Sequence, residues 1–149
     1  MSPPVLIYRI GNWMYRNRLI RLSKMVSYIN RVLFSTWIPS SATIGSNFTV
    51  GYWGLGIVIH SNAVIGNNVT IAQNVTLGRN FGDVSVPRIG NDVYIGTGTV
   101  VFGEIDIGDN VIIGANSVIN RSLSPNITAV GNPFKIIATN RTLTYHQLK

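Results

Sequence analysis

The sequence predicts a mainly β protein, a parallel β-helix of six-residue repeats that follows a short N-terminal helical segment. Three observations support this fold class. Aliphatic residues recur every six positions over residues 38–119, glycine often follows them, and asparagine or aspartate often comes next. A period of six fits neither the 3.6-residue period of a helix nor a simple hairpin meander.

The first element, residues 1–37, is expected to contain one or two amphipathic helices. Its apolar residues recur at mixed spacings of three and four, among them Leu19, Leu22, Met25, Ile29, Val32 and Leu33. We expect these helices to cover the open end of the β-helix, where strand edges would otherwise be unpaired. A membrane-surface helix, with Arg and Lys flanking Trp13, Tyr15 and Trp37, is the alternative.

The second element, residues 38–130, contains the repeat itself. Its aliphatic positions are Ile38, Ile44, Val50, Ile59, Ile65, Ile71, Leu77, Ile89, Ile95, Val101, Ile107, Ile113 and Ile119. One six-residue unit cannot bury its own apolar side, so the units must stack. With three units in a coil, residues 18 apart lie above one another, about 4.8 Å per coil. Ile59 is then expected over Leu77, and Ile95 over Ile113.

The residues that follow these positions suit tight corners between short strands. Glycine follows in eight cases, namely Gly45, Gly51, Gly66, Gly78, Gly90, Gly96, Gly108 and Gly114. Glycine lowers stability in regular structure unless a corner or a close backbone approach needs it. Asn and Asp crowd the next positions, where their side chains can satisfy the backbone of a turn.

Two segments interrupt the period. Residues 51–58 lengthen one coil, and residues 79–88 lack the repeat and are expected to form an outward loop. If the whole loop lies outside the coil, the strands after it stack on different strands than if part of it stays in the coil. The sequence does not decide between the two arrangements. The third element, residues 131–149, begins with a turn at Gly131 to Pro133 and continues as an apolar stretch and a polar tail.

The composition is that of a single folded domain. Of the 149 residues, 46% are hydrophobic and 11% are charged, which excludes a disordered chain. The absence of cysteine excludes disulfides, thiolate metal sites and thiol nucleophiles. Two distant histidines and scattered acids predict no metal site. Because no uncharged apolar run reaches 18 residues, no membrane span is expected, and we expect a cytoplasmic location.

Positive charge is concentrated near the N-terminus. The formal net charge is +7, and six basic residues lie within residues 1–37, all before the first acidic residue, Asp83: Arg9, Arg16, Arg18, Arg21, Lys24 and Arg31. Such a one-sided field favours anionic partners, including the inner face of a membrane. A solvated basic face on a helix explains the pattern equally well. No nucleic-acid-binding motif accompanies the charge, so nucleic acid is not an expected partner.

Three segments occur in a specific order: AVIGNNVTIAQNVTLG (63–78), PRIGNDVYIGTGTVVFGEIDIGDNVIIGANSVI (87–119) and AVGNPFKII (129–137). Together they resemble the hexapeptide-repeat acyltransferases, and more narrowly the serine acetyltransferase-like branch, which includes many O-acetyltransferases of bacterial polysaccharides. The resemblance implies a left-handed parallel β-helix, a homotrimer, and acetyl-CoA as the donor of the acetyl group.

In that family a histidine takes the proton from a substrate hydroxyl as its oxygen attacks the thioester carbonyl, and backbone N–H groups stabilise the oxyanion. The matching position holds Tyr52 in this chain, and Val86 stands where serine acetyltransferases carry a second histidine. The two histidines present are His60 and His146. We take His60 and Tyr52 as the catalytic candidates, although a phenol is a poor base near neutral pH. A surface or interface histidine is the alternative for His60, and His146 is expected to be solvated.

The remaining candidates concern binding of the two substrates. Trp53 is expected to stack on a sugar ring, and Arg88 to reach an anionic acceptor or the CoA phosphates. By resemblance, the donor site comprises Gly78, Arg79, Gly98, Ala115 and Lys135. The small residues there would admit the pantetheine arm, and Lys135 would lie near the CoA phosphates. Corner geometry alone also demands small residues at two of these positions, 98 and 115, and loop arginines are usually only solvated.

The preferred function is therefore an acetyl-CoA-dependent O-acetyltransferase that acts on a sugar or polysaccharide hydroxyl. The basic N-terminal region would suit an acidic or lipid-linked glycan. Two alternatives remain open: a serine O-acetyltransferase, and a non-catalytic trimeric subunit that binds CoA or serves as a scaffold. The second alternative rests on Tyr52 at the position of the family histidine.

Overall fold

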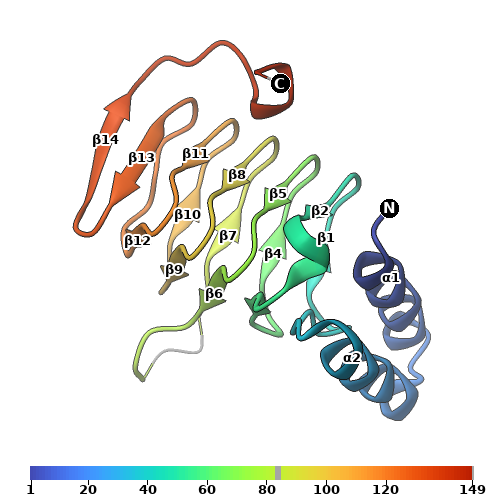
Figure 1. Cartoon of the computed structure of the whole chain (residues 1–149). Helices are drawn as coiled ribbons and strands as arrows, with labels where there is room; N and C mark the ends of the chain where they lie inside the picture. Colours follow the sequence, from blue (N-terminus) through green and yellow to red (C-terminus); the bar gives the residue numbers. More distant parts are fainter. Residues whose placement is uncertain (83–84, 149) are drawn as a thin grey trace.

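The protein is a parallel β-helix with two helices across its first coil (Figure 1). A computed structural model describes residues 1–82 and 85–148. The helices are α1 (Pro3–Arg16) and α2 (Ile20–Phe34). The strands are β1 (Thr43–Ile44), β2 (Thr49–Val50), β3 (Val58–Ile59), β4 (Val64–Ile65), β5 (Thr70–Ile71), β6 (Thr76–Gly78), β7 (Arg88–Ile89), β8 (Tyr94–Ile95), β9 (Val100–Phe102), β10 (Asp106–Ile107), β11 (Ile112–Ile113), β12 (Val118–Ile119), β13 (Thr128–Gly131) and β14 (Phe134–Ala138). Two short 3₁₀ turns are η1 (Gly51–Gly54) and η2 (Tyr145–Gln147).

The strands form three faces of a triangular coil. The first face contains β3, β6, β9 and β12, the second contains β1, β4, β7 and β10, and the third contains β2, β5, β8, β11, β13 and β14. Neighbouring strands pair in parallel on every face, and only β14 is antiparallel to its partner, β13. The predicted fold class, a parallel β-helix with a short N-terminal helical segment, is confirmed.

The stacking register agrees with the predicted one. It also shows which strands stack on one another across the loop of residues 79–88, which the sequence did not decide. Ile59 pairs with Leu77, and Ile95 pairs with Ile113, as expected. Beyond the loop, Ile71 pairs with Ile95 on the third face, so the order of faces continues unchanged. Neighbouring coils are therefore offset by 18 residues where the repeat is regular and by 24 across the loop. The described part of the loop leaves the coil at a corner, where Phe81 is fully exposed, and residues 83–84 of the predicted loop lie outside the described residues.

The interior contains two sets of side chains, of which the sequence analysis identified one. All thirteen predicted aliphatic residues are buried, and none is more than 6% exposed. A second inward set lies two positions earlier in each repeat, and the sequence analysis missed it: Ala42, Phe48, Ile57, Ala63, Val69, Val75, Pro87, Val93, Thr99, Ile105, Val111 and Ser117. Each six-residue unit therefore buries two side chains, which explains how so thin a coil sustains a core.

The corners between the second and third faces are held by a ladder of Asn and Asp side chains. The Oδ1 atoms of Asn67, Asn91 and Asp109 each accept a hydrogen bond from the backbone N–H of the residue one coil above, at 2.8, 2.9 and 2.6 Å. Gly45 stands over this ladder, and a Cβ there would lie 2.5 Å from Asn67 Oδ1. Seven further Asn and Asp residues at corners adopt φ angles of 53° to 62°, namely Asn47, Asn68, Asn74, Asp92, Asn110, Asn116 and Asn126. Asn and Asp tolerate this left-handed conformation better than most residues do.

Helix α1 covers the open edge of the first coil, as expected. The N–H groups of Thr43 and Gly45 donate to carbonyls of the second coil, whereas the carbonyls of Ala42, Ile44 and Gly45 accept hydrogen bonds from the helix. The Tyr8 hydroxyl donates to the carbonyl of Ala42 at 2.7 Å, and the Arg9 guanidinium donates to the carbonyls of Ile44 and Gly45. These hydrogen bonds satisfy acceptors that would otherwise form an unpaired strand edge.

Helix α2 makes polar contacts with α1 and with the start of the coil. Asn30 Nδ2 donates to the carbonyl of Pro4 at 3.0 Å, and the hydroxyls of Ser27 and Ser40 lie 2.8 Å apart. In the part of the chain that the structure describes, neither helix has the length and apolar content needed to cross a bilayer.

The C-terminal residues return along the coil after β14. The Arg141 N–H donates to the carbonyl of Asn126, and Tyr145 stacks on Tyr94 with ring centroids 3.9 Å apart. His146 is exposed, as expected, but its Nε2 also donates to the carbonyl of Asn68 at 3.1 Å. The segment after residue 138 therefore docks against the coil over the corners between the second and third faces.

Replacing Tyr8 with phenylalanine should lower the free energy of unfolding by about 1 kcal/mol, because the buried hydrogen bond from the Tyr8 hydroxyl to the carbonyl of Ala42 is lost. Burial raises the pKa of the Tyr8 phenol above its ordinary value of 10.0, against a smaller lowering by Arg9. The contribution of the neutral phenol to the free energy of unfolding is therefore fully present below pH 10. It is lost as pH rises through the higher pKa of the folded state. Urea titrations at pH 8 and pH 11 should show a smaller difference between variant and parent at pH 11. The exposed Tyr15→Phe variant is the control, and an unchanged difference at both pH values would contradict the assignment.

Candidate active site

The candidate residues lie on two edges of the triangular coil and on the C-terminal hairpin. The edge where the third face turns into the first, called here the aromatic edge, bears Tyr52, Trp53, Gly98 and Ala115. The edge where the first face turns into the second bears His60, Gly78 and Arg79, and Arg88 opens the next strand, β7. Lys135 lies on β14, opposite Val130 of β13. One chain therefore does not bring His60 together with the aromatic pair.

The aromatic pair projects because the corner that carries it is longer than the others. Turn η1 holds Tyr52 at φ 45° and Trp53 at φ 55°, a left-handed conformation that costs about 1–3 kcal/mol for each such residue. Their side chains are 79% and 61% exposed. The ring of Phe34, at the end of α2, meets Trp53 edge to face at a centroid distance of 5.9 Å. The indole is thus held at the surface with one face available.

A groove lies between the end of α2 and this corner. It has a volume of about 480 Å³ and is lined by Leu33, Phe34, Ser35, Tyr52, Trp53 and Leu55. None of these six side chains is charged, so the groove suits a neutral ring better than a free amino acid, which carries two charges. The sequence analysis missed Leu33, Phe34 and Ser35 here. Only the folded chain places α2 against residues twenty positions away.

The predicted donor residues Gly98 and Ala115 are neighbours on adjacent coils of the aromatic edge. Asn116 N–H donates to the carbonyl of Thr97 at 2.8 Å, which fixes the two corners together. Gly98 has a φ of 68°, a left-handed conformation in which a side chain is strained, so the corner itself favours glycine there. Ala115 is exposed and has no such constraint from its own side chain. At these two corners no large side chain projects from the aromatic edge beside the groove.

The other edge carries His60 in an arrangement that hinders its role as a base. His60 is half-buried, and its Nδ1 accepts a hydrogen bond from the N–H of Asn62 at 3.2 Å. A neutral imidazole with Nδ1 as acceptor carries its proton on Nε2 and has no free lone pair. His60 would have to turn away from Asn62 before it could accept a proton.

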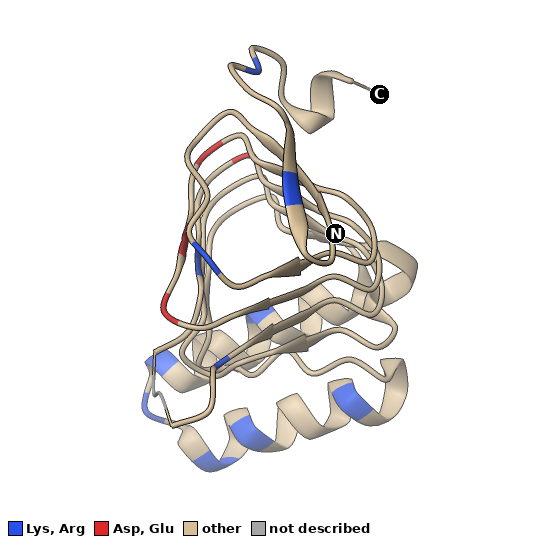
Figure 2. Ribbon diagram, turned by 90° about the vertical axis from the view of Figure 1, so that its left-hand side faces the viewer, with Lys and Arg blue, Asp and Glu red and all other residues tan. Residues whose placement is uncertain are grey.

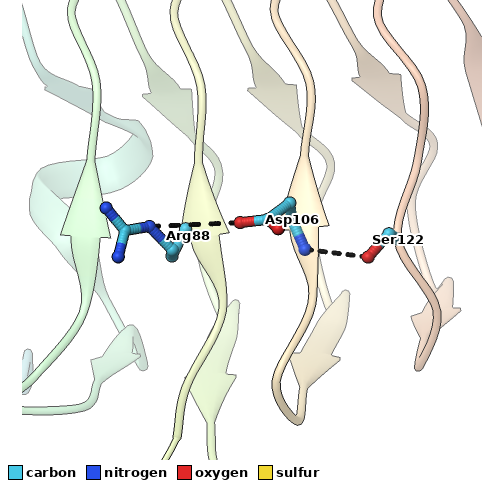
Figure 3. A network of polar contacts seen from close by, with 3 residues as sticks. All are labelled: Arg88, Asp106 and Ser122. Carbon is cyan, nitrogen blue, oxygen red and sulfur yellow. Dashed lines mark hydrogen bonds and ion pairs between the residues drawn. The ribbon is translucent and has the colours of Figure 1, made fainter.

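The arginine candidates on this side are largely free of protein partners. Arg88 Nε lies 4.0 Å from Asp106 Oδ1, and the Asp106 N–H donates to Ser122 Oγ at 3.0 Å (Figure 3). Both charged side chains are more than 70% exposed, so this ion pair contributes little to stability. Arg79 is exposed at the start of the loop. Within residues 1–82 and 85–148, no three His, Cys, Asp or Glu side chains gather into a metal-binding group.

Comparison with known proteins agrees with this architecture. The family model described as bacterial transferase hexapeptide (six repeats) matches residues 87–121. The putative colanic acid biosynthesis acetyltransferase WcaB of Escherichia coli (strain K12) is 35% identical over 142 residues, which cover 89% of this chain and 87% of WcaB. The chain belongs to the hexapeptide-repeat acyltransferases. The resemblance predicted from the sequence is thereby confirmed.

Other members of the hexapeptide-repeat acyltransferases are longer. The serine acetyltransferase of Synechococcus elongatus is 34% identical over 135 residues, which cover 89% of this chain but 55% of the relative. A crystal structure of the Brucella abortus serine acetyltransferase in complex with coenzyme A superposes with a TM-score of 0.87 at 30% identity, covering 93% of this chain and 56% of that one. The chain thus spans about half the length of these serine acetyltransferases and most of the length of WcaB.

Proposed function

We propose that this acyltransferase transfers the acetyl group of acetyl-CoA to a hydroxyl of a sugar or polysaccharide. The observation that carries the proposal is the uncharged aromatic groove beside the small-residue corners of the same edge. The apolar face of a sugar ring can stack on the exposed indole of Trp53, while Tyr52 offers a hydroxyl for hydrogen bonding. The match over 87% of WcaB, a putative colanic acid biosynthesis acetyltransferase, supports the same acceptor class.

The donor is proposed to lie along the aromatic edge. Gly98 and Ala115 would admit the pantetheine arm, and Lys135 would lie near the phosphates, where positive charge stabilises anions. Gly78 and Arg79 belong to the edge that bears His60, so they would reach the phosphates from a neighbouring subunit. A related serine acetyltransferase has been crystallised with coenzyme A, which supports this donor class. The proposal includes a homotrimer, because a threefold axis brings different edges of neighbouring subunits together. In such an assembly, the His60 edge of one subunit would face the groove of the next.

The reaction requires the acceptor oxygen to attack the thioester carbonyl carbon, after which the carbon–sulfur bond breaks. The hydroxyl proton leaves with a base and finally protonates the CoA thiolate. His60 is the proposed base after its ring leaves the Asn62 N–H, and Tyr52 is proposed to orient the acceptor hydroxyl. Arg88 is proposed to contact an anionic group of the acceptor.

The test measures release of CoA thiol from acetyl-CoA by the purified protein with different acceptors. Soluble fragments of acidic bacterial polysaccharide should release thiol at least tenfold faster than L-serine, and the product should gain one acetyl group by mass spectrometry. Equal or faster release with serine would replace the proposal with a serine O-acetyltransferase.

A non-catalytic CoA-binding or scaffold subunit is the second candidate. Tyr52 and Val86 stand at the two histidine positions of the family, and the lone pair of His60 is occupied. Tight CoA binding by calorimetry, without thiol release for any acceptor, would favour this candidate.

Replacing Tyr52 with histidine should raise thiol release about tenfold or more, because an imidazole at the groove supplies a general base. Histidine tolerates the left-handed backbone of this position, so the fold should be kept. The matched control is Tyr52→Phe, which removes the hydroxyl and adds no base. No gain in the histidine variant, with CoA still bound, would show that the acceptor site does not support transfer.

A further inference from the structure

Helix α2 has its polar side buried and its apolar side exposed. Its buried residues are Ser23, Ser27 and Asn30. The side that points away from the coil, called here the outer face of α2, consists of Leu22, Met25, Ile29, Val32 and Leu33, which are 45–82% exposed. An amphipathic helix in a soluble protein normally shows the opposite orientation. A contiguous exposed apolar face of this kind marks a contact surface.

The charges around the outer face point to an anionic partner. Arg18, Arg21, Lys24 and Arg31 are all exposed on or next to α2, and the sequence contains no acidic residue before Asp83. Figure 2 shows basic residues spread along both helices and the acidic residues on the coil. A second copy would bring like charges together, whereas an anionic lipid surface attracts them. Helices that lie in a membrane interface combine an apolar side with Lys and Arg in this way.

We infer that the outer face of α2 binds the surface of an anionic membrane, with the β-helix standing away from it. The helices lie across one end of the coil (Figure 1), so the membrane would contact that end and leave all three faces accessible. Leucine, methionine and valine side chains of this face would enter the headgroup region, and Arg18, Arg21 and Lys24 would pair with lipid phosphates. Arg31 lies over the Trp37 ring of the first coil and adds to the positive field without pairing.

The same face adjoins the proposed acceptor groove. Leu33 belongs to the outer face of α2 and also lines the groove beside Tyr52 and Trp53. A saccharide attached to a membrane lipid would therefore enter the groove from the bilayer. This second step rests on the proposed function and narrows the acceptor to a lipid-linked saccharide.

The membrane contact is tested by flotation with vesicles, without any substrate. The parent protein should bind vesicles of equal phosphatidylglycerol and phosphatidylcholine, bind weakly to pure phosphatidylcholine, and dissociate as salt rises. Met25→Gln combined with Val32→Gln keeps good helix formers and should weaken binding at least tenfold. Arg21→Glu combined with Lys24→Glu should weaken it by a similar factor, since each cation contributes about fivefold near an anionic surface. The control is Ile137→Gln, an exposed isoleucine of β14 at the other end of the coil.

Vesicle binding that is equal in parent and both double variants, or absent in the parent, would overturn the inference. A change in molecular mass by analytical ultracentrifugation in Met25→Gln/Val32→Gln, with vesicle binding unchanged, would assign the face to a second copy instead. Circular dichroism of each variant establishes that the fold is kept.

The acceptor step is tested by comparing a lipid-linked saccharide in vesicles with the same saccharide in solution. The Met25→Gln/Val32→Gln variant should lose at least tenfold in transfer to the lipid-linked acceptor and keep transfer to the soluble one. Vesicle binding without transfer to either acceptor would overturn the proposed function and leave the membrane face supported. Transfer to the soluble acceptor without vesicle binding would overturn the membrane face alone.

Discussion

Replacing Ile95 with alanine is expected to lower the free energy of unfolding by about 2–5 kcal/mol. Ile95 is fully buried and stacks between Ile71 and Ile113 on the third face. Removing three carbon atoms leaves a cavity that the neighbouring coils cannot close, because the corner hydrogen bonds fix their spacing. A loss of this size is a large part of the total stability of a domain, which is about 5–15 kcal/mol. Urea denaturation followed by circular dichroism measures it.

The control for this prediction is Ile137→Ala on β14, where the same atoms are removed from a side chain that is 64% exposed. A surface substitution of this kind should change the free energy of unfolding by less than about 0.5 kcal/mol. Equal losses at both positions would contradict the assignment of Ile95 to a shared internal column.

Replacing Ala115 with tryptophan is expected to lower kcat/KM for acetyl-CoA by about 100-fold and to weaken CoA binding. Ala115 is exposed, so the added ring extends outward over the aromatic edge without entering the core. The ring would occupy the space proposed for the pantetheine arm beside Gly98. Displacing a thioester by about 1 Å from its reactive position already costs about 100-fold in rate. Thiol-release kinetics and calorimetry with CoA measure the two effects.

Ser124→Trp provides the control for the Ala115 variant. Ser124 is another small, exposed corner residue, on the edge between the second and third faces. Its variant should bind CoA and release thiol as the parent does. Unchanged CoA binding in Ala115→Trp would remove this edge from the donor site, and loss in both variants would indicate a general effect of the added ring.

The part of the core that consists only of Ile, Leu and Val could be predicted from the sequence. The columns through Ile59 and Ile95 were predictable because every member is Ile, Leu or Val at a fixed spacing. The second inward set was missed because alanine, serine, threonine and phenylalanine share those positions, for example Ala63, Thr99 and Ser117. A search for small or apolar residues two positions before each aliphatic would have found it.

Contacts between distant segments were harder to predict. A twelve-residue interval between Leu77 and Ile89 is compatible with two arrangements of the loop, and the strand pairing in the folded chain, such as that of Ile71 with Ile95, decides between them. The inward direction of Arg9 was also not predictable, because a charged side chain on a helix is usually solvated. Likewise, the sequence pattern of α2 indicates an apolar side but not that this side faces away from the coil.

The sequence indicated which residues belong to the candidate site but not how they lie relative to one another. The separation of His60 from Tyr52 follows from the triangular path of the chain, since positions eight residues apart fall on different edges. The hydrogen bond from Asn62 to His60 depends on the local backbone and has no signature in the sequence. For that reason the roles of His60 and Tyr52 remain predictions for the experiments above.

The extra residues in η1 and the described residues of the loop leave the coil at its corners without disturbing the stacked columns. Doubling the length of such an excursion costs only about 0.6 kcal/mol in chain entropy. Bends can therefore lengthen and change in sequence during evolution at little cost to folding. The corners can therefore change what the protein contacts while the stacked strands keep the coil unchanged.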